Sequence, residues 1–278
     1  MQLIAIHTPI LRPGDDIAAA LAQSERIRPG DIIVVSSKAV ATVEGAAADL
    51  RALSPSPDAR RYAEATGRSA LFMQAVLDET ARLHGTVRGT CPGALLTQVR
   101  PQGFPHGTIL TANAGMDQSN VPDGFAIGWP RDPVASAREL RNKLISTACH
   151  PELRRGSTRD VVQSWFDGAH HDTPSLAVLL TDSACRPRRW GVTAFALASA
   201  GLDPLLPQKG ERDLFGSELR ITTEAVADQL ATAANAVMGN AAQRIPAVII
   251  RDHGFPFRDF VGWVPGIEPE EDLFRGVI

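Results

Sequence analysis

The chain has 278 residues, of which 44% are hydrophobic, 21% charged and 5% aromatic, and its formal net charge is −3. This length allows one large domain or two modest ones around a sizeable core. The slightly negative charge gives no general attraction to nucleic acid or anionic membranes, and the few aromatics argue against stacking platforms for single strands. We therefore expect small-molecule partners, with no nucleic acid and no membrane.

Cysteine usage and hydropathy bear on the compartment. The three cysteines, Cys91, Cys149 and Cys185, contain no CxxC pair, which favours a reducing compartment over a disulfide framework. Residues 1–7 lack the basic region and long apolar run of a signal peptide. No stretch approaches the 18 apolar residues of a transmembrane helix. These features predict a cytoplasmic protein.

The first half of the chain alternates short apolar strands with capped helices. Strands are predicted over residues 3–6, 32–35 and 108–110, and a hairpin over 86–99, broken by Cys91-Pro-Gly93. Helices are predicted over 17–23 with Asp15 or Asp16 as the cap, over 59–66 between a cap at Asp58 and a stop at Gly67, and from Ser69 to Leu83.

The second half begins with a helix from Pro133 to about residue 145, with Asp132 as its N-cap. Its apolar positions predict Ala137, Leu140 and Leu144 inside and Arg138, Arg141 and Lys143 on the surface. Strands are predicted over 176–181, 219–222 and 247–250, and a helix from a cap at Thr222 or Thr223 to Met238, stopped by Gly239. Residues 146–174, with His150, His170 and His171, are polar and irregular and are predicted to be a surface insertion.

Polar residues follow three apolar strands. Ser36-Ser37-Lys38 suits a phosphate, with a solvated strand end as the alternative. Asp117 and Asn120 form a cluster of oxygen ligands on a turn, which could equally be an ordinary Asn/Asp-rich turn. Asp182-Ser183 ends the strand over 176–181, a position where α/β proteins often place functional groups.

Together these strand ends predict a metal-dependent enzyme that acts on a phosphorylated substrate or nucleotide. Two carboxylates on separate strands could share Mg²⁺ or Mn²⁺, because magnesium commonly uses one or two protein carboxylates and completes its shell with phosphates and water. Neither G-x-x-x-x-G-K-[ST] nor G-x-G-x-x-G occurs, so neither standard nucleotide motif is available.

Several motifs follow one another along the chain. They are Asp31-Ile-Ile-Val-Val-Ser-Ser-Lys38 with Glu44-Gly45, Thr111-Ala-Asn-Ala-Gly-Met-Asp-Gln-Ser-Asn-Val121, Arg131-Asp-Pro, Leu180-Thr-Asp-Ser183, Asp213-Leu-Phe-Gly216, Met238-Gly239 and the tail Glu271-Asp-Leu-Phe274. Their order and spacing resemble those of the coenzyme F420-0:L-glutamate ligase family over nearly the whole chain.

The resemblance implies a mixed α+β fold with largely antiparallel sheets, in which residues 1–278 form a single catalytic unit of two interleaved lobes and two chains form an intertwined homodimer. It also implies that GTP and Mg²⁺ or Mn²⁺ activate a carboxylate of coenzyme F420-0, a deazaflavin precursor, as an acyl phosphate that L-glutamate converts into an amide. By position, Asp117 and Asp182 would be catalytic, and the metal ligands would be Asp117, Asp182 and Ser183. The nucleotide would contact Pro9, Ile10, Leu11, Ser37, Lys38, Asn120, Gly239 and Asn240.

The chain departs from the family pattern mainly near the substrates. Thr42 stands where a lysine is common before Glu-Gly, Ala184-Cys185 replaces the usual pair after Asp182-Ser183, and Asn240-Ala-Ala-Gln-Arg244 has no glycine. These departures keep three alternatives open: the same ligase chemistry on another acceptor or amino acid, a non-catalytic nucleotide-binding relative, and a metal-dependent phosphohydrolase. Arg138, Arg141, Arg186, Arg188 and Arg189 are candidates for an acceptor phosphate, with a plain surface role as the alternative.

Overall fold

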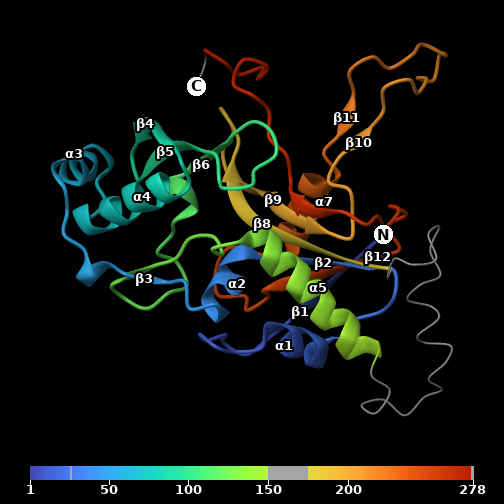
Figure 1. Ribbon diagram of the computed structural model, residues 1–278, viewed down its shortest axis with the longest axis horizontal. Coiled ribbons are helices and arrows are strands. Elements are labelled where there is room, and N and C mark those ends of the chain that lie inside the picture. Colours follow the sequence, from blue (N-terminus) through green and yellow to red (C-terminus); the bar gives the residue numbers. More distant parts are fainter. Residues whose placement is uncertain (26, 150–174, 277–278) are drawn as a thin grey trace.

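The fold is a mixed α+β arrangement built around one six-stranded sheet, as the computed structural model shows for residues 1–25, 27–149 and 175–276 (Figure 1). The strands lie in the order β1 (Gln2–Ile6), β12 (Ala247–Arg251), β2 (Asp31–Ser36), β8 (Leu176–Cys185), β9 (Val192–Ala200) and β13 (Val261–Trp263). Only β2 and β8 pair in parallel among the described strands. The prediction of largely antiparallel sheets is therefore confirmed.

Strand directions bring several strand ends to one side of this sheet. Because β12 pairs antiparallel with both β1 and β2, and β2 pairs parallel with β8, the strands β1, β2 and β8 run in the same direction. Their carboxyl ends therefore share one edge, at which β12 begins. We call this end of the sheet, where β1, β2 and β8 finish and β12 begins, the shared edge.

Helices cover both faces of the sheet. Helices α1 (Ile17–Ser24) and α5 (Pro133–Cys149) pack with alternate strand residues such as Ile33 and Val178, and α7 (Val226–Met238) packs with the other set, such as Ile32 and Leu179. In Figure 1, α5 crosses one face of the sheet. Burial on both faces explains why β2, β8 and β12 are almost continuously apolar. The helix α2 (Ser37–Val43) follows β2 without a loop.

A second group of elements lies beside this sheet, at the left of Figure 1. It contains α3 (Pro57–Thr66), α4 (Ala70–Arg82) and a three-stranded antiparallel sheet of β4 (Thr86–Cys91), β5 (Ala94–Val99) and β6 (Ile109–Ala112). Phe72, Met73, Val76 and Leu95 form its core. The predicted hairpin over 86–99 is confirmed, whereas the division into two interleaved lobes and the homodimer stay predictions.

Short elements complete the chain. They are the pairs β3 (Ala48–Asp49) with β7 (Phe125–Ala126) and β10 (Leu206–Pro207) with β11 (Thr223–Glu224), and the 3-10 turns η1 (Leu50–Ala52) and η2 (Asn113–Gly115). Within the described ranges, no helix is long and apolar enough to cross a membrane.

Most predicted helix ends are confirmed by their capping bonds. Asp16 accepts from the backbone N–H groups of Ala18 and Ala19, and Ser69 accepts from that of Phe72. Gly67 ends α3 with a φ of 71°, in the left-handed region that glycine adopts readily. The cap of α3 is Ser56 rather than Asp58, because Pro57 already occupies the first helical position.

Helix α5 begins as predicted but differs in length and in one side chain. Asp132 accepts from the backbone N–H of Ala135 at 2.9 Å, and Ala137, Leu140 and Leu144 are buried. The helix continues to Cys149, so residues 146–149 are helical rather than part of an insertion. The rest of the predicted insertion, with His150, His170 and His171, lies outside the described residues.

The predicted surface position of Arg141 is wrong. Its side chain is buried, and its Nε donates to the backbone oxygen of Leu176 at 2.7 Å. The guanidinium thereby satisfies a backbone carbonyl at the start of β8, and Arg141 is no candidate for an acceptor phosphate. Position 141 lies on the same helical stripe as Ala137, Leu140 and Leu144, but the charge of arginine led to its assignment to the polar surface.

The predicted strand over 219–222 is also wrong. Thr223 and Glu224 pair with Leu206 and Pro207, and between these strands the chain forms the long projection at the upper right of Figure 1. Helix α7 consequently begins at Val226, after Ala225, without a threonine cap. Ile221, an apolar residue of the predicted strand, is 92% exposed, and Phe215 of the preceding turn is 95% exposed.

An ion pair at the opposite end of the sheet yields a stability prediction. Asp31 is fully buried and binds Arg251 through two hydrogen bonds, of 2.7 and 2.8 Å. We expect Asp31→Ala to lower the free energy of unfolding by about 3–5 kcal/mol, because it leaves a largely buried guanidinium without this partner. Urea unfolding at pH 7 measures the change.

Asp49→Ala is the matched control, since Asp49 and Arg51 form an equally bidentate pair that is solvent-exposed. We expect a far smaller loss in that variant, because exposed pairs contribute little. Equal losses in the two variants would contradict the importance of burial at Asp31.

Candidate functional site

Most residues predicted to bind a nucleotide lie at the shared edge. Residues 9–11 follow β1, Ser37 and Lys38 follow β2, and residues 239–246 connect α7 to β12. Two backbone bonds fasten this last segment: the N–H of Thr8 donates to the oxygen of Arg244 at 3.3 Å, and that of Ser36 donates to Pro246 at 2.9 Å. The structure therefore brings together three segments that are far apart in sequence.

Asp117 reaches the same place from the connection between β6 and β7. Its backbone exchanges two hydrogen bonds of 2.8 Å with Ile127, which fixes the main chain there. Its carboxylate accepts from the backbone N–H groups of Gln118 and Ser119 and from the Ser119 hydroxyl. The predicted Asn/Asp-rich turn is therefore present, and Asn120 is exposed at a left-handed φ of 57°.

An ion pair joins Asp117 to the shared edge. The Nζ of Lys38 lies 2.6 Å from the Oδ2 of Asp117, and both side chains are partly exposed. Burial alone would raise the pKa of Asp117, but hydrogen bonds from Lys38 and Ser119 outweigh it and hold the pKa below its usual value. Asp117 is therefore a stable anion across the physiological range.

Asp182 is the second carboxylate, and its surroundings differ. It lies in β8 one residue beyond Thr181, the residue that pairs with Ser36. It is almost fully buried, and its Oδ2 accepts from the indole Nε1 of Trp129 at 2.7 Å. Burial raises the pKa of Asp182, while the charge of Lys38 and the bond from Trp129 oppose the rise. Two neighbouring carboxylates thus have pKa values shifted in opposite directions.

Ser183 does not share the orientation of Asp182. Successive side chains of a strand point to opposite faces. Asp182, which pairs with Phe195, is on the same face of the sheet as Leu180, the face that α5 covers. Ser183, which pairs with Ala194, is on the face that α7 covers. Ser183 can therefore join Asp182 at one ion through its main-chain oxygen more readily than through its hydroxyl.

The predicted nucleotide residues differ in exposure. Pro9, Ile10 and Asn240 are exposed, and Leu11 is partly exposed. Ser37 is fully buried, and its Oγ has no hydrogen-bond partner among the residues described. A buried hydroxyl without a partner is uncommon, so it marks a place where the bonding is incomplete.

The segment after α7 keeps a fixed shape although it lacks the expected glycines. Gly239 has a φ of 68°, and a Cβ there would lie 2.5 Å from the side-chain amide of Gln243. That amide oxygen accepts from the backbone N–H of Ala241 at 2.7 Å. The Gln243 side chain thus folds back over Gly239. Asn240 belongs to the short segment that this contact closes.

Trp129 is a site residue that sequence reasoning missed. Gly115 adopts a φ of 78°, and a Cβ there would lie 2.4 Å from the Nε1 of Trp129, so glycine permits the approach of the indole. The sequence pattern assigns Trp129 no role beyond the segment that leads into α5. The sequence offers one signal for a site role of Trp129: it is one of only four tryptophans in the chain, and it stands next to a turn.

The donor set at Asp117 and Asp182 fits a hard divalent cation. The ligands would be two carboxylates from separate segments with an oxygen of Ser183, and magnesium needs no more protein ligands when phosphates and water complete its shell. Among the described residues, no group of three or more histidine, cysteine, aspartate or glutamate side chains could hold a metal ion. The site therefore suits a cation that arrives with a phosphorylated substrate better than one held by the protein alone.

The chain is similar in sequence to known proteins along nearly its whole length. The family model described as F420-0:Gamma-glutamyl ligase matches residues 5–153 and 170–252. The chain is 35% identical over 266 residues to the coenzyme F420:L-glutamate ligase of Methanopyrus kandleri, covering 96% of this chain and 86% of the relative. It is 37% identical over 286 residues to the enzyme of that name from Methanothermobacter thermautotrophicus, covering 99% of each chain.

The opposite pKa shifts predict opposite effects of two isosteric changes on stability without divalent cations. For Asp117, the folded pKa lies below the unfolded value of 3.8, so its ionised form stabilises the protein above that value and the contribution fades as the pH falls through the folded pKa. Asp117→Asn should therefore destabilise the protein at pH 7, with a smaller loss at pH 3.

Asp182→Asn should instead stabilise the cation-free protein at pH 7. The folded pKa of Asp182 lies above 3.8, so the cost of its charge is complete above the folded pKa and is relieved as the pH falls through it. The gain should shrink toward pH 3. Urea unfolding of both variants at the two pH values provides the measurement, and effects of the same sign at pH 7 would contradict the assignment.

Proposed function

Because the chain belongs to the F420-0:gamma-glutamyl ligase family, we propose that it joins L-glutamate to a carboxylate of coenzyme F420-0, with GTP as co-substrate and Mg²⁺ or Mn²⁺ as the metal. The observation that carries the proposal is the meeting of Asp117, Lys38 and Asp182 at the shared edge. Two carboxylates and a lysine beside exposed loops are what a site for a metal-bound triphosphate requires. A cytoplasmic homodimer belongs to the proposal through the family resemblance.

The proposed reaction has two steps. A carboxylate oxygen of the acceptor attacks the γ-phosphorus of GTP, the bond to the β-phosphate oxygen breaks, and GDP leaves. The amine of L-glutamate then attacks the carbonyl carbon of the acyl phosphate. Inorganic phosphate leaves with the bonding electrons, the nitrogen loses a proton, and an amide remains. Activation is needed because a carboxylate anion resists attack by an amine.

Each site residue has a proposed role. Asp117 and Asp182 would hold the cation with an oxygen of Ser183, and Lys38 would turn from Asp117 toward the phosphates. Residues 9–11, Ser37, Asn120, Gly239 and Asn240 would contact the nucleotide. When bound, the cation would neutralise charge on the triphosphate and on the transferring phosphoryl group.

Trp129 would orient Asp182 and exclude water from it. The indole donates to one carboxylate oxygen, Oδ2, and thereby fixes the orientation of the carboxylate. Its bulk also shields the buried carboxylate from solvent, since Trp129 and Asp182 are both almost inaccessible. Exclusion of water matters because an acyl phosphate hydrolyses readily.

A second candidate keeps this chemistry with another acceptor or amino acid. The observation that favours it is the pair Ala184-Cys185, which follows the proposed metal ligands in β8, together with the unusual segment 240–244. A metal-dependent phosphohydrolase remains the alternative in which water replaces the acceptor carboxylate.

A mass-spectrometric assay distinguishes these functions. The purified protein is incubated with GTP, Mn²⁺, L-glutamate and coenzyme F420-0, and we expect a product heavier than the acceptor by one glutamyl residue. A product formed only with another amino acid or acceptor would support the second candidate. GDP release that is equally fast without any amine or acceptor would favour the hydrolase and contradict the ligase.

Asp117→Asn should reduce metal-dependent turnover by roughly a hundredfold or more, because it removes a charge that acts on the transferring phosphoryl group. The matched control is Asp123→Asn, an exposed carboxylate six residues further along the same connection. Initial rates of GDP release with acceptor and glutamate give the comparison. Survival of activity in the first variant, or its loss in the control, would show that Asp117 lacks the proposed role.

A further inference from the structure

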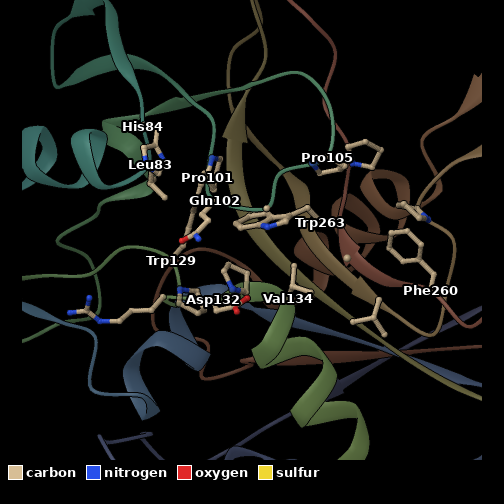
Figure 2. Close-up of a pocket in the computed structure, with 18 of the residues that line it drawn as sticks. Leu83, His84, Pro101, Gln102, Pro105, Trp129, Asp132, Val134, Phe260 and Trp263 are labelled. Atoms are coloured by element: carbon tan, nitrogen blue, oxygen red, sulfur yellow. The ribbon is translucent and has the colours of Figure 1, made fainter.

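A cavity of about 1030 Å³ lies beside the site, and the mechanism above does not use it. Its lining comes from the end of α4, the loop after β5, the segment that starts α5, the connection after β9, and β13. Figure 2 shows side chains from these segments around Trp263, among them His84, Gln102, Val134 and Phe260. This volume is at the upper end of the range for small-molecule sites.

We propose that this cavity binds the flat heteroaromatic part of the acceptor, while the acceptor carboxylate reaches Asp182. The inference rests on the proposed function and extends it by assigning the acceptor a place. Three features carry it: the position of the cavity along the sheet, the construction of its walls and the balance of its charged groups.

The order of the strands separates the cavity from the predicted nucleotide residues. Apart from Asn120, those residues follow β1 and β2 or precede β12, at one end of the order β1-β12-β2-β8-β9-β13. The cavity is bounded by β13 and by the connection after β9, at the other end. Asp182 lies on β8, between the two. A nucleotide at one end and an acceptor at the other would therefore meet at Asp182.

Trp129 connects the cavity directly to the proposed centre of the reaction. It lines the cavity, and its Nε1 donates to the Oδ2 of Asp182 at 2.7 Å. The cavity and the carboxylate are thus separated by one indole ring. An acceptor with its ring in the cavity needs to extend only past this side chain to place a carboxylate at Asp182.

The walls are aromatic and already fixed. Trp263 packs edge to face against Phe104 with ring centroids 5.7 Å apart, and Trp129 packs in the same way against Phe195 at 6.2 Å. The prolines of the lining restrict the loops between them; they are Pro101, Pro105, Pro130, Pro133, Pro204 and Pro265. A preformed apolar cavity suits a rigid planar ligand, because little conformational freedom is lost on binding.

The charged groups of the lining favour an anionic ligand. Arg131 is exposed and has no hydrogen-bond or ion-pair partner within residues 1–25, 27–149 and 175–276. The two acidic residues of the lining are already engaged: Asp132 caps α5, and Asp203 lies 3.9 Å from the Nε of Arg258. Arg131 is therefore the group available to bind an anionic substituent of the acceptor.

Two cavity variants test the assignment through steady-state kinetics. Arg131→Met removes the available cation, and Val261→Trp places a bulky ring in the cavity at a half-exposed strand position. Each should raise the KM for coenzyme F420-0 about tenfold, the effect of losing one charge-assisted hydrogen bond or a comparable contact. The KM for GTP should stay within about twofold of the wild-type value.

Matched controls separate this effect from a general loss of structure. Arg88→Met changes an exposed arginine of β4, and Val192→Trp enlarges an exposed valine of β9; neither residue lines the cavity. Both should keep the wild-type KM for the acceptor. A wild-type KM in both cavity variants, or an equal rise in the controls, would overturn the cavity assignment while the ligase function stands. Failure of the wild-type protein to glutamylate or bind coenzyme F420-0 would overturn the function itself, and the assignment with it.

Discussion

The parallel pairing of β2 with β8 brings Lys38 and Asp182, two of the central residues of the proposed site, to the shared edge. Its register places Ser36 opposite Thr181, so Lys38 and Asp182 emerge at the same edge of the sheet. Parallel neighbours need a long connection, and here the chain uses it to build the elements that carry Asp117 and Trp129. A register shift of one residue would turn Asp182 toward α7 and separate it from Asp117 and Trp129.

Asp117 and Asp182 illustrate how one fold can hold two carboxylates in different electrostatic states. Asp117 is surrounded by donors and accepts from Lys38, whereas Asp182 is buried and has Trp129 as its one side-chain donor among the described residues. The same ammonium acts on both carboxylates. Lys38 therefore balances the charge of the pair, and any cation that binds there must take over this role.

Local patterns were sufficient to predict much of the fold and part of the site. Buried strands and capping residues depend on neighbours in sequence, and for that reason the caps Ser69 and Asp132 are predicted correctly, whereas β8 continues past Asp182 to Cys185. The role of Trp129 and the burial of Arg141 depend on partners far along the chain, Asp182 and Leu176. Pattern reasoning has no access to such partners, and it also interpreted residues 219–222, in the exposed projection near Ile221, as a strand.

The ion pair between Lys38 and Asp117 makes the binding of two ligands interdependent. A divalent cation at Asp117 would displace the ammonium of Lys38, which would then lack an anion 2.6 Å away. A triphosphate would supply a replacement anion, so it would favour the displaced state that the cation also favours. By thermodynamic reciprocity, each ligand would then raise the affinity for the other by the same factor. A site of this kind would bind each ligand more tightly when the other is present, so it would favour a cation bound to triphosphate over a free metal ion without a dedicated gate.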